Sequence, residues 1–159
     1  MNRKIFIFLE EILVVSIFQY ILYNFLNFKI IPSFFLIYLL LLSFEGAPEL
    51  SLFLSFFLGI LNDFFSKGVL GISSIRYLLI VYFSSFFVVK SIKEKSIFIF
   101  IFSFLYFVFS NLEKKVEFIW SGKILLKYAI LFSFYNFLIT IIIATFAKEI
   151  KKRWEEKYF

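Results

Sequence analysis

The sequence contains no cysteine and no histidine in its 159 residues, and charged residues make up only 18% of it. Without cysteine there are no disulfides and no thiol nucleophiles, and without histidine there is no His-based acid–base chemistry. Nearly all zinc and haem sites are excluded for the same reason. The little charge that exists is unevenly spread, because long runs of the chain are almost uncharged.

What the sequence has in excess is apolar side chains. Hydrophobic residues make up 62% of the chain and the mean hydropathy is +0.96. Soluble domains contain roughly 45–50% apolar residues, and a soluble protein of this size could not bury so many more. The apolar runs are long and nearly uncharged, which is typical of membrane spans. We therefore expect an integral membrane protein with one membrane domain.

The net charge of +6 could suggest binding to nucleic acid, but the Lys and Arg residues stand at the boundaries of the apolar runs. Positive charge there sets membrane topology and contacts anionic headgroups. We therefore expect the lipid bilayer as a partner, and no nucleic acid. The first apolar run is too long for the core of a signal peptide and has no small-residue cleavage site, so no cleaved leader is expected.

Six apolar segments can be drawn as membrane spans, and each is expected to be helical because lipid cannot satisfy unpaired backbone groups. The expected fold class is all-α, a polytopic bundle of six transmembrane helices in residues 1–147, followed by a basic tail at 148–159. The second and third spans are short against the ~20 residues that a perpendicular span needs. A five-span fold with one re-entrant segment is the alternative. The predicted spans are approximately Ile5–Asn27, Ile30–Phe44 (opened by Pro32), Leu50–Phe65, Ile72–Val89, Ser96–Leu112 and Ile124–Ala147.

The distribution of Lys and Arg predicts the orientation of the spans. With the N-terminus inside, the cytoplasmic segments hold ten of these residues and the outside loops hold five. We therefore expect both termini in the cytoplasm. The tail KEIKKRWEEKYF is expected to continue the last helix into the headgroups. It serves either as a basic stop that sets topology or as a docking segment for a cytoplasmic partner.

Small and polar residues recur at helical spacing inside the predicted spans. In the third span, Ser51, Ser55, Gly59 and Asp63 stand four residues apart and therefore share one helix face. Helices in lipid associate through such faces. We expect these faces to form the inner seams of the bundle, with Phe-rich backs toward lipid; a ligand-lined cavity is the competing interpretation. Two similar faces consist of Ser96, Ser103 and Ser110 in the fifth span, and of Ser133, Asn136, Thr140, Ala144 and Ala147 in the sixth.

Asp63 is the most informative residue, because an ionised carboxylate beside hydrocarbon costs several kcal/mol unless it has a partner or a wet position. It stands where the third span ends, and Arg76 lies about one turn into the fourth. Gly68 and Gly71 lie between them and permit the tight backbone of a short helical hairpin. We predict an ion pair between Asp63 and Arg76 that fixes the register of the two helices. The alternative is that each side chain reaches the outer interface by itself.

No catalytic constellation is visible in the sequence. There is no nucleophile beside a base, no phosphate-binding loop and no metal-ligand cluster, so we expect neither an enzyme nor a bound cofactor. Glu10 and Glu11 are explained by an interfacial position near the start of the first span. Gln19, Asn24 and Asn27 are expected to form interhelical hydrogen bonds.

The run FFLGILNDFFSKGVLGISSIRYLL resembles a segment of the rod-shape-determining MreD family, which reads roughly Gly, hydrophobic, Asp, hydrophobic, Ser, then Gly before the next span. The matching residues are Gly59, Asp63, Ser66, Gly68 and Gly71. Chain length, six spans, the proline that opens the second span and the basic tail also fit this family. The chain departs from the pattern at two positions, with Lys67 where the family often has Gly and Val69 where it often has Pro.

The resemblance implies a non-enzymatic subunit of the bacterial cell-elongation machinery, located in the bacterial inner membrane. Such a subunit would bind MreC and, through it, connect MreB filaments with RodA and the elongation transpeptidase that build peptidoglycan. The MreD family is similar in fold to the S-components of energy-coupling-factor vitamin transporters, so a vitamin-binding transport subunit is the second hypothesis. S-components usually carry Ala-x-x-x-Ala on the first span, whereas the first span here has no alanine. An unrelated membrane protein with a chance motif is the third.

Overall fold

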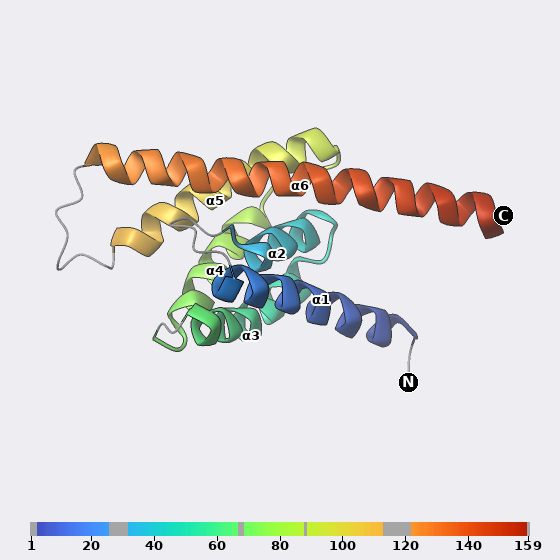
Figure 1. The fold of residues 1–159 in the computed structure, drawn as a ribbon, viewed down its shortest axis with the longest axis horizontal. Coiled ribbons are helices and arrows are strands. Elements are labelled where there is room, and N and C mark those ends of the chain that lie inside the picture. Colours follow the sequence, from blue (N-terminus) through green and yellow to red (C-terminus); the bar gives the residue numbers. More distant parts are fainter. Residues whose placement is uncertain (1–2, 26–31, 67–68, 88, 113–121, 159) are drawn as a thin grey trace.

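A computed structural model describes residues 3–25, 32–66, 69–87, 89–112 and 122–158. In these residues the fold is all-helical, as predicted, with six helices and no strand (Figure 1). The helices are α1 (Arg3–Phe25), α2 (Phe34–Phe44), α3 (Pro48–Ser66), α4 (Ile72–Ser84), α5 (Ile92–Leu112) and α6 (Gly122–Tyr158).

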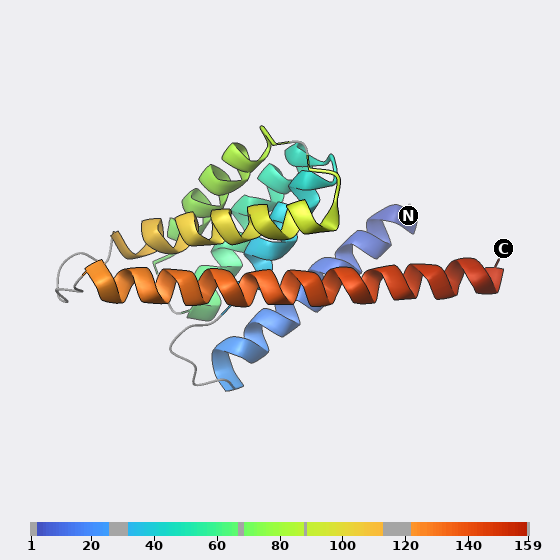
Figure 2. The same cartoon turned by 90° about the horizontal axis from the view of Figure 1, so that it is seen from above.

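The helices form two hairpins around a central element. α5 and α6 lie side by side and antiparallel in both views, and α3 packs against α4 (Figures 1 and 2). α1 runs obliquely to α6 when the molecule is seen from above (Figure 2). The start of α1 and the end of α6 lie at the same end of the molecule. α2 is central, because it contacts every other helix.

α2 lies at the centre of the hydrophobic core because its side chains are apolar on nearly all sides. Phe35, Leu36, Leu39 and Leu40 are completely buried, and Ile37 is nearly so. A helix that is hydrophobic all round needs other helices to cover it. With 11 residues it is roughly 16 Å long, about half the thickness of a bilayer's hydrocarbon core. α2 is therefore too short to cross a bilayer by itself.

The start of α2 differs from the prediction of a helix from Ile30. The first helical residue is Phe34, because Ser33 takes the N-cap position directly after Pro32. The Ser33 side chain accepts a hydrogen bond from the N–H of Leu36 at 3.3 Å, which satisfies one donor of the first turn.

α4 ends at Ser84, five residues before the predicted end at Val89. Two serines at this point compete with the helical hydrogen bonds, since Ser84 Oγ donates to the Val81 carbonyl at 2.8 Å and Ser85 Oγ donates similarly. The backbone then tightens, with the N–H of Phe87 bonded to the Ser84 carbonyl at 3.0 Å. These contacts end the helix early.

α5 begins at Ile92, four residues before the prediction, because a capping box precedes it. The N–H of Glu94 donates to Ser91 Oγ at 3.2 Å, and the Glu94 carboxylate accepts the N–H of Ser91 at 3.3 Å. Lys95 in the same turn forms an ion pair of 3.2 Å with Glu45, which follows α2. The start of α5 therefore lies at the same end of the molecule as the α2–α3 turn.

Among the residues that the structure describes, two helical segments are long and apolar enough to cross a membrane, Pro48–Ser66 and Ile124–Thr145. The described residues also include two apolar helices that are shorter, Phe34–Phe44 and Ile72–Ser84. α6 does not stop with its apolar segment: it continues as a helix to Tyr158, as predicted for the tail.

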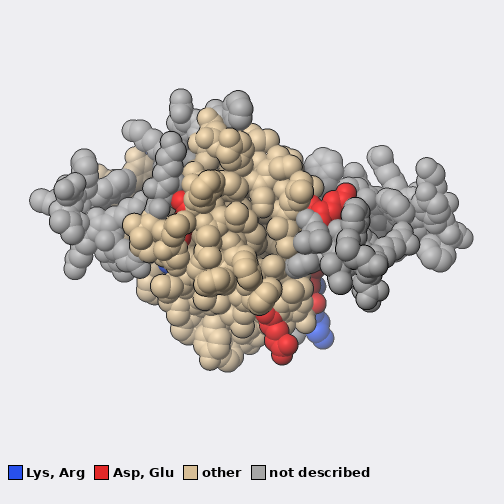
Figure 3. All heavy atoms as spheres, turned by 90° about the horizontal axis from the view of Figure 1, so that it is seen from below, with Lys and Arg blue, Asp and Glu red and all other residues tan. Residues whose placement is uncertain are grey.

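The distribution of side chains differs from that in a water-soluble protein, because many polar side chains are buried and many large apolar side chains are exposed. Among the described residues, the buried set contains almost as many polar as apolar members, whereas more than thirty large apolar side chains are exposed. Figure 3 shows one face on which charged atoms lie at the edges of a broad uncharged surface. An exposed apolar surface of this extent is not tolerated by a monomer in water. The helices thus turn their polar residues inward.

Candidate functional site

Asp63 is 4% exposed and completes the cap of the next helix. Its Oδ2 accepts the N–H of Gly71 at 2.8 Å and the N–H of Ser73 at 3.1 Å. Gly71 is the N-cap residue of α4 and has no side chain with which to cap it. Asp63, near the end of α3, supplies the missing acceptor, and its negative charge faces the positive end of the α4 dipole.

This arrangement differs from the predicted ion pair between Asp63 and Arg76. In the described residues the carboxylate is held by backbone N–H groups of the α4 cap, while Arg76 is half-buried one turn farther along α4. The prediction considered only side-chain charges, but the first N–H groups of a helix are themselves strong donors that need partners. The register of the α3–α4 hairpin is therefore fixed by a bond from side chain to backbone.

Gly71 has a φ of +94°, in the left-handed region, so the predicted role of a glycine in this turn is confirmed for this residue. No heavy atom lies within 4 Å of the position that a Cβ would take there. The requirement for glycine is thus one of backbone conformation and not of space. Gly68, the other glycine of the predicted turn, lies outside the described residues.

Gly59 is needed for a different reason, which is close approach between α3 and α4. A Cβ built on Gly59 would overlap the backbone N and Cα of Ser74. Ser74 in turn donates its hydroxyl to the Phe56 carbonyl of α3 at 2.7 Å. Small residues at such a crossing let two helix backbones meet, which is how helices gain packing energy in lipid.

Ser51 and Ser55 continue the same face of α3 toward its start, and both are completely buried. The Ser51 hydroxyl donates to the Leu39 carbonyl of α2 at 2.6 Å. Ser55 donates to the Ser51 carbonyl of its own helix at 2.8 Å. The predicted small-residue face is therefore an inner seam that packs on α2 at one end and on α4 at the other.

Asn62 joins a third helix to the Asp63 cap, a connection that the sequence analysis missed. Its Nδ2 donates to Ser73 Oγ at 3.0 Å, and its Oδ1 accepts the hydroxyl of Tyr23 in α1 at 3.2 Å. The side chain is 4% exposed. The only signal for Asn62 in the sequence was its position next to Asp63, because it does not belong to the four-residue spacing that defines the small-residue face of α3.

Asn136 in α6 is the centre of a second polar cluster, near the start of α2. Its Oδ1 accepts the N–H of Ser33 at 3.1 Å, and its Nδ2 donates to Ser103 Oγ of α5 at 2.9 Å. Ser33 Oγ also shares a hydrogen bond of 3.0 Å with the hydroxyl of Tyr77 in α4. One buried asparagine thus links α2, α5 and α6, and the Ser33–Tyr77 contact adds α4.

Gln19 adds α1 to this second cluster. Its Oε1 accepts the N–H of Phe34, the first residue of α2, at 2.8 Å, which agrees with the expected interhelical bond. Asn24 behaves differently from the prediction, since it donates to the Tyr20 carbonyl of its own helix. Asn27 lies outside the described residues. The buried N-terminus of α2 is therefore satisfied by side chains from the surrounding helices.

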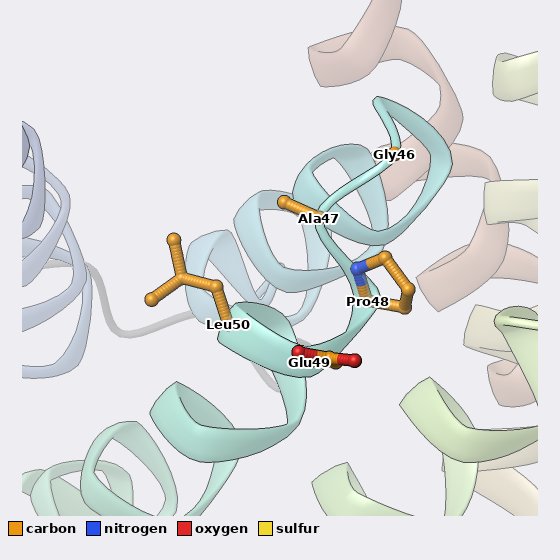
Figure 4. A pocket seen from close by; sticks show the side chains of 5 residues that line it. All are labelled: Gly46, Ala47, Pro48, Glu49 and Leu50. Atoms are coloured by element: carbon orange, nitrogen blue, oxygen red, sulfur yellow. The ribbon is translucent and has the colours of Figure 1, made fainter.

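Two hollows in the described part of the chain lie open on the surface. One, of about 470 Å³, is formed by consecutive residues of the α2–α3 turn, Gly46–Leu50. Figure 4 shows the side chains of Glu49 and Leu50 pointing away from each other, so they do not converge on a ligand. The other, of about 210 Å³, lies between α5 and α6 and is lined by Ile97, Phe100, Phe134 and Phe137.

The chemistry available to the buried polar residues is that of helix association. Most of their hydrogen bonds cap a helix start or cross between helices, as at Asp63 and Asn136. Within the described residues there is no group of three acidic residues that could hold a metal ion. The two clusters, one at Asp63 and one at Asn136, are therefore the polar contacts that hold the helices of the bundle together.

Comparison with known proteins adds no relative, because no family model, no curated protein and no solved structure matches the chain. The functional assignment consequently rests on the residues and geometry described above.

The Asn136 cluster gives a first prediction. Replacing Asn136 by Leu leaves the N–H of Ser33 without its acceptor in a buried place, so the free energy of unfolding in detergent should fall by about 1–2 kcal/mol. Thermal melts of the purified protein measure this. Tyr135→Phe, a change at an exposed neighbour on the same helix, is the matched control and should leave the melting temperature unchanged. Equal melting temperatures for all three proteins would show that the hydrogen bonds of Asn136 do not stabilise the bundle.

Proposed function

We propose that this protein is a non-enzymatic membrane scaffold whose six helices form a bundle within the bacterial inner membrane. The observation that carries the proposal is the large number of apolar side chains on the outside, combined with many buried polar groups. The buried polar groups are used to join helices, while large apolar side chains cover the outside. A protein built in this way presents helix surfaces, and helix surfaces recognise other helices in lipid.

Multiple passage of the membrane is supported by the arrangement of the helices. α1 starts and α6 ends at the same end of the molecule, as an even number of passages requires (Figures 1 and 2). The twofold excess of Lys and Arg in the segments on the side of the two termini supports a cytoplasmic position for both. The short α2 fits this topology as an element enclosed by the other helices.

Within membrane scaffolds, we assign the chain to the MreD class, with MreC as the principal partner. The support comes from the residues of the resemblance, because Gly59, Asp63 and Gly71 all act at the α3–α4 contact. Motif residues that meet at one helix–helix contact support the family resemblance more strongly than the same residues at unrelated positions would. MreB, RodA and the elongation transpeptidase are then reached through MreC.

Coexpression with MreC tests this function. An affinity tag on the present protein should retain MreC from solubilised membranes in a constant ratio, and an unrelated single-span protein with equal expression is the control. MreC that is retained no better than this control would contradict the assignment. Copurification of a vitamin in place of a protein would favour the transport subunit instead.

A further inference from the structure

We propose that the outer groove between α5 and α6 is a binding site for an anionic phospholipid, which takes one acyl chain against Phe100 and Phe137 and places its phosphate beside Lys93. The inference rests on the membrane location that the proposed function assumes, and it adds a ligand that the scaffold role does not require. The groove is the 210 Å³ hollow lined by Ile97, Phe100, Phe134 and Phe137.

The walls of the groove suit a hydrocarbon chain. The rings of Phe100 and Phe137 meet edge to face with centroids 6.4 Å apart, and Phe134 stacks on Phe137 at 6.4 Å. All four lining side chains are apolar. Ile97 is 54% and Phe134 47% exposed, so the groove opens to the surroundings of the bundle. It is smaller than the 300–1,000 Å³ pockets that enclose small molecules, which fits a chain lying along a groove.

Positive charge stands at one end of the groove. Lys93, Ile97 and Phe100 follow one another at spacings of four and three, so they share one face of α5. Lys93 is exposed, and the start of α5 adds the positive end of its helix dipole. The neighbouring carboxylate of Glu94 is engaged with the N–H of Ser91 in the capping box, and Lys95 is paired with Glu45.

The depth of Lys93 matches that of a lipid phosphate. Ser103 lies near the middle of α5 and bonds Asn136 near the middle of the apolar segment Ile124–Thr145, so this pair marks the centre of the membrane. Lys93 is ten residues from Ser103, or roughly 15 Å along the helix. That distance is about half of the ~30 Å hydrocarbon core. The groove residues Ile97 and Phe100 lie between these levels, where acyl chains are.

The chain offers a control at the opposite end of the same groove. Lys127 is exposed and lies seven residues before Phe134, hence on the same face of α6. Because α5 and α6 are antiparallel (Figures 1 and 2), the start of α6 lies toward the surface of the membrane opposite to the start of α5. Lys127 is seven residues from the nearest groove residue of its helix, Phe134, whereas Lys93 is four residues from Ile97. A lysine that acts only by general attraction to anionic lipid would have the same effect at either place.

Native mass spectrometry of the purified protein in detergent tests the site, with dioleoyl phosphatidylglycerol and dioleoyl phosphatidylcholine as probes. The wild type should bind the anionic lipid more tightly, and Lys93→Gln should weaken that binding about fivefold, the effect of one lysine near a membrane surface. Lys127→Gln should leave it unchanged. Ile97→Trp, which fills the groove, should reduce binding of both lipids without lowering the melting temperature.

Four results would overturn the site: equal affinity for the two lipids, equal losses in Lys93→Gln and Lys127→Gln, no loss in Ile97→Trp, or full competition by glycerophosphoglycerol, which has the headgroup but no acyl chains. Copurification of MreC, measured on the same preparations, separates this proposal from the scaffold function. A protein that retains MreC and shows no lipid preference refutes the lipid site alone.

Discussion

Gly59→Val is expected to abolish the folded bundle or to lower its melting temperature in detergent by roughly 10 °C, the equivalent of about 3 kcal/mol. Any Cβ at this position overlaps the N and Cα of Ser74, which are backbone atoms and cannot rotate away. α3 and α4 would have to separate, and the cap that Asp63 provides for α4 would be lost with the contact.

Phe57→Ala is the matched control, because Phe57 lies two residues earlier on α3 with a side chain that is 48% exposed. This change should leave the melting temperature within 2 °C of the wild type, about the effect of a surface substitution. A stable Gly59→Val protein would show that the helices do not approach each other here. Size-exclusion chromatography distinguishes a folded variant from an aggregated one before the melts are compared.

Asp63→Ala is the second large effect, expected to reduce the free energy of unfolding by about 2–3 kcal/mol. The change leaves the partly buried N–H of Gly71 and the buried N–H of Ser73 without an acceptor, and it removes a negative charge that interacts favourably with the positive end of the α4 dipole. Asp63→Asn keeps one oxygen as an acceptor and should lose only about half as much. Thermal melts in the same detergent should rank the stability of the three proteins as wild type, then Asp63→Asn, then Asp63→Ala.

A double-mutant cycle distinguishes this cap from the ion pair that charge pairing alone predicts. If Asp63 bonds the backbone, the losses in Asp63→Asn and Arg76→Gln should add to within about 0.5 kcal/mol in the double variant. If Asp63 and Arg76 formed a direct ion pair, the double variant would lose clearly less free energy of unfolding than the sum of the two single losses. The second outcome would restore Arg76 as the partner of Asp63.

The sequence predicted the helices and their inner faces well because both depend on local periodicity. Long apolar runs must be helical in lipid. Residues four apart on a helix share a face, so the sequence alone was enough to place Ser51, Ser55 and Gly59 on one face of α3. Gly71 could be assigned to a tight turn because few other residues adopt its φ at low cost.

The polar partners could not be predicted, because they join residues far apart in the chain. Asn136 bonds the N–H of Ser33, 103 residues away, and nothing in the spacing of either residue indicates this. The expectation of Arg76 as the partner of Asp63 has a related origin: the Asp63 carboxylate accepts its hydrogen bonds from backbone N–H groups, a kind of donor that every residue except proline possesses. Of the second cluster, the inward position of Asn136 and the interhelical role of Gln19 could be predicted, but their partners could not. The Ser33 cap was visible in principle, as a serine that follows a proline and precedes an apolar run.

The most direct test of the account uses the absence of cysteine, which allows single cysteines to be introduced without background. Phe53, Ile101 and Tyr135 are exposed apolar residues on three helices, and Glu49 is an exposed residue of the α2–α3 end. In intact membranes, a membrane-impermeant maleimide should label Glu49→Cys once its side of the membrane is opened, and should leave the other three unlabelled until detergent denatures the protein. Equal labelling at all four positions would contradict the placement of the bundle within the bilayer.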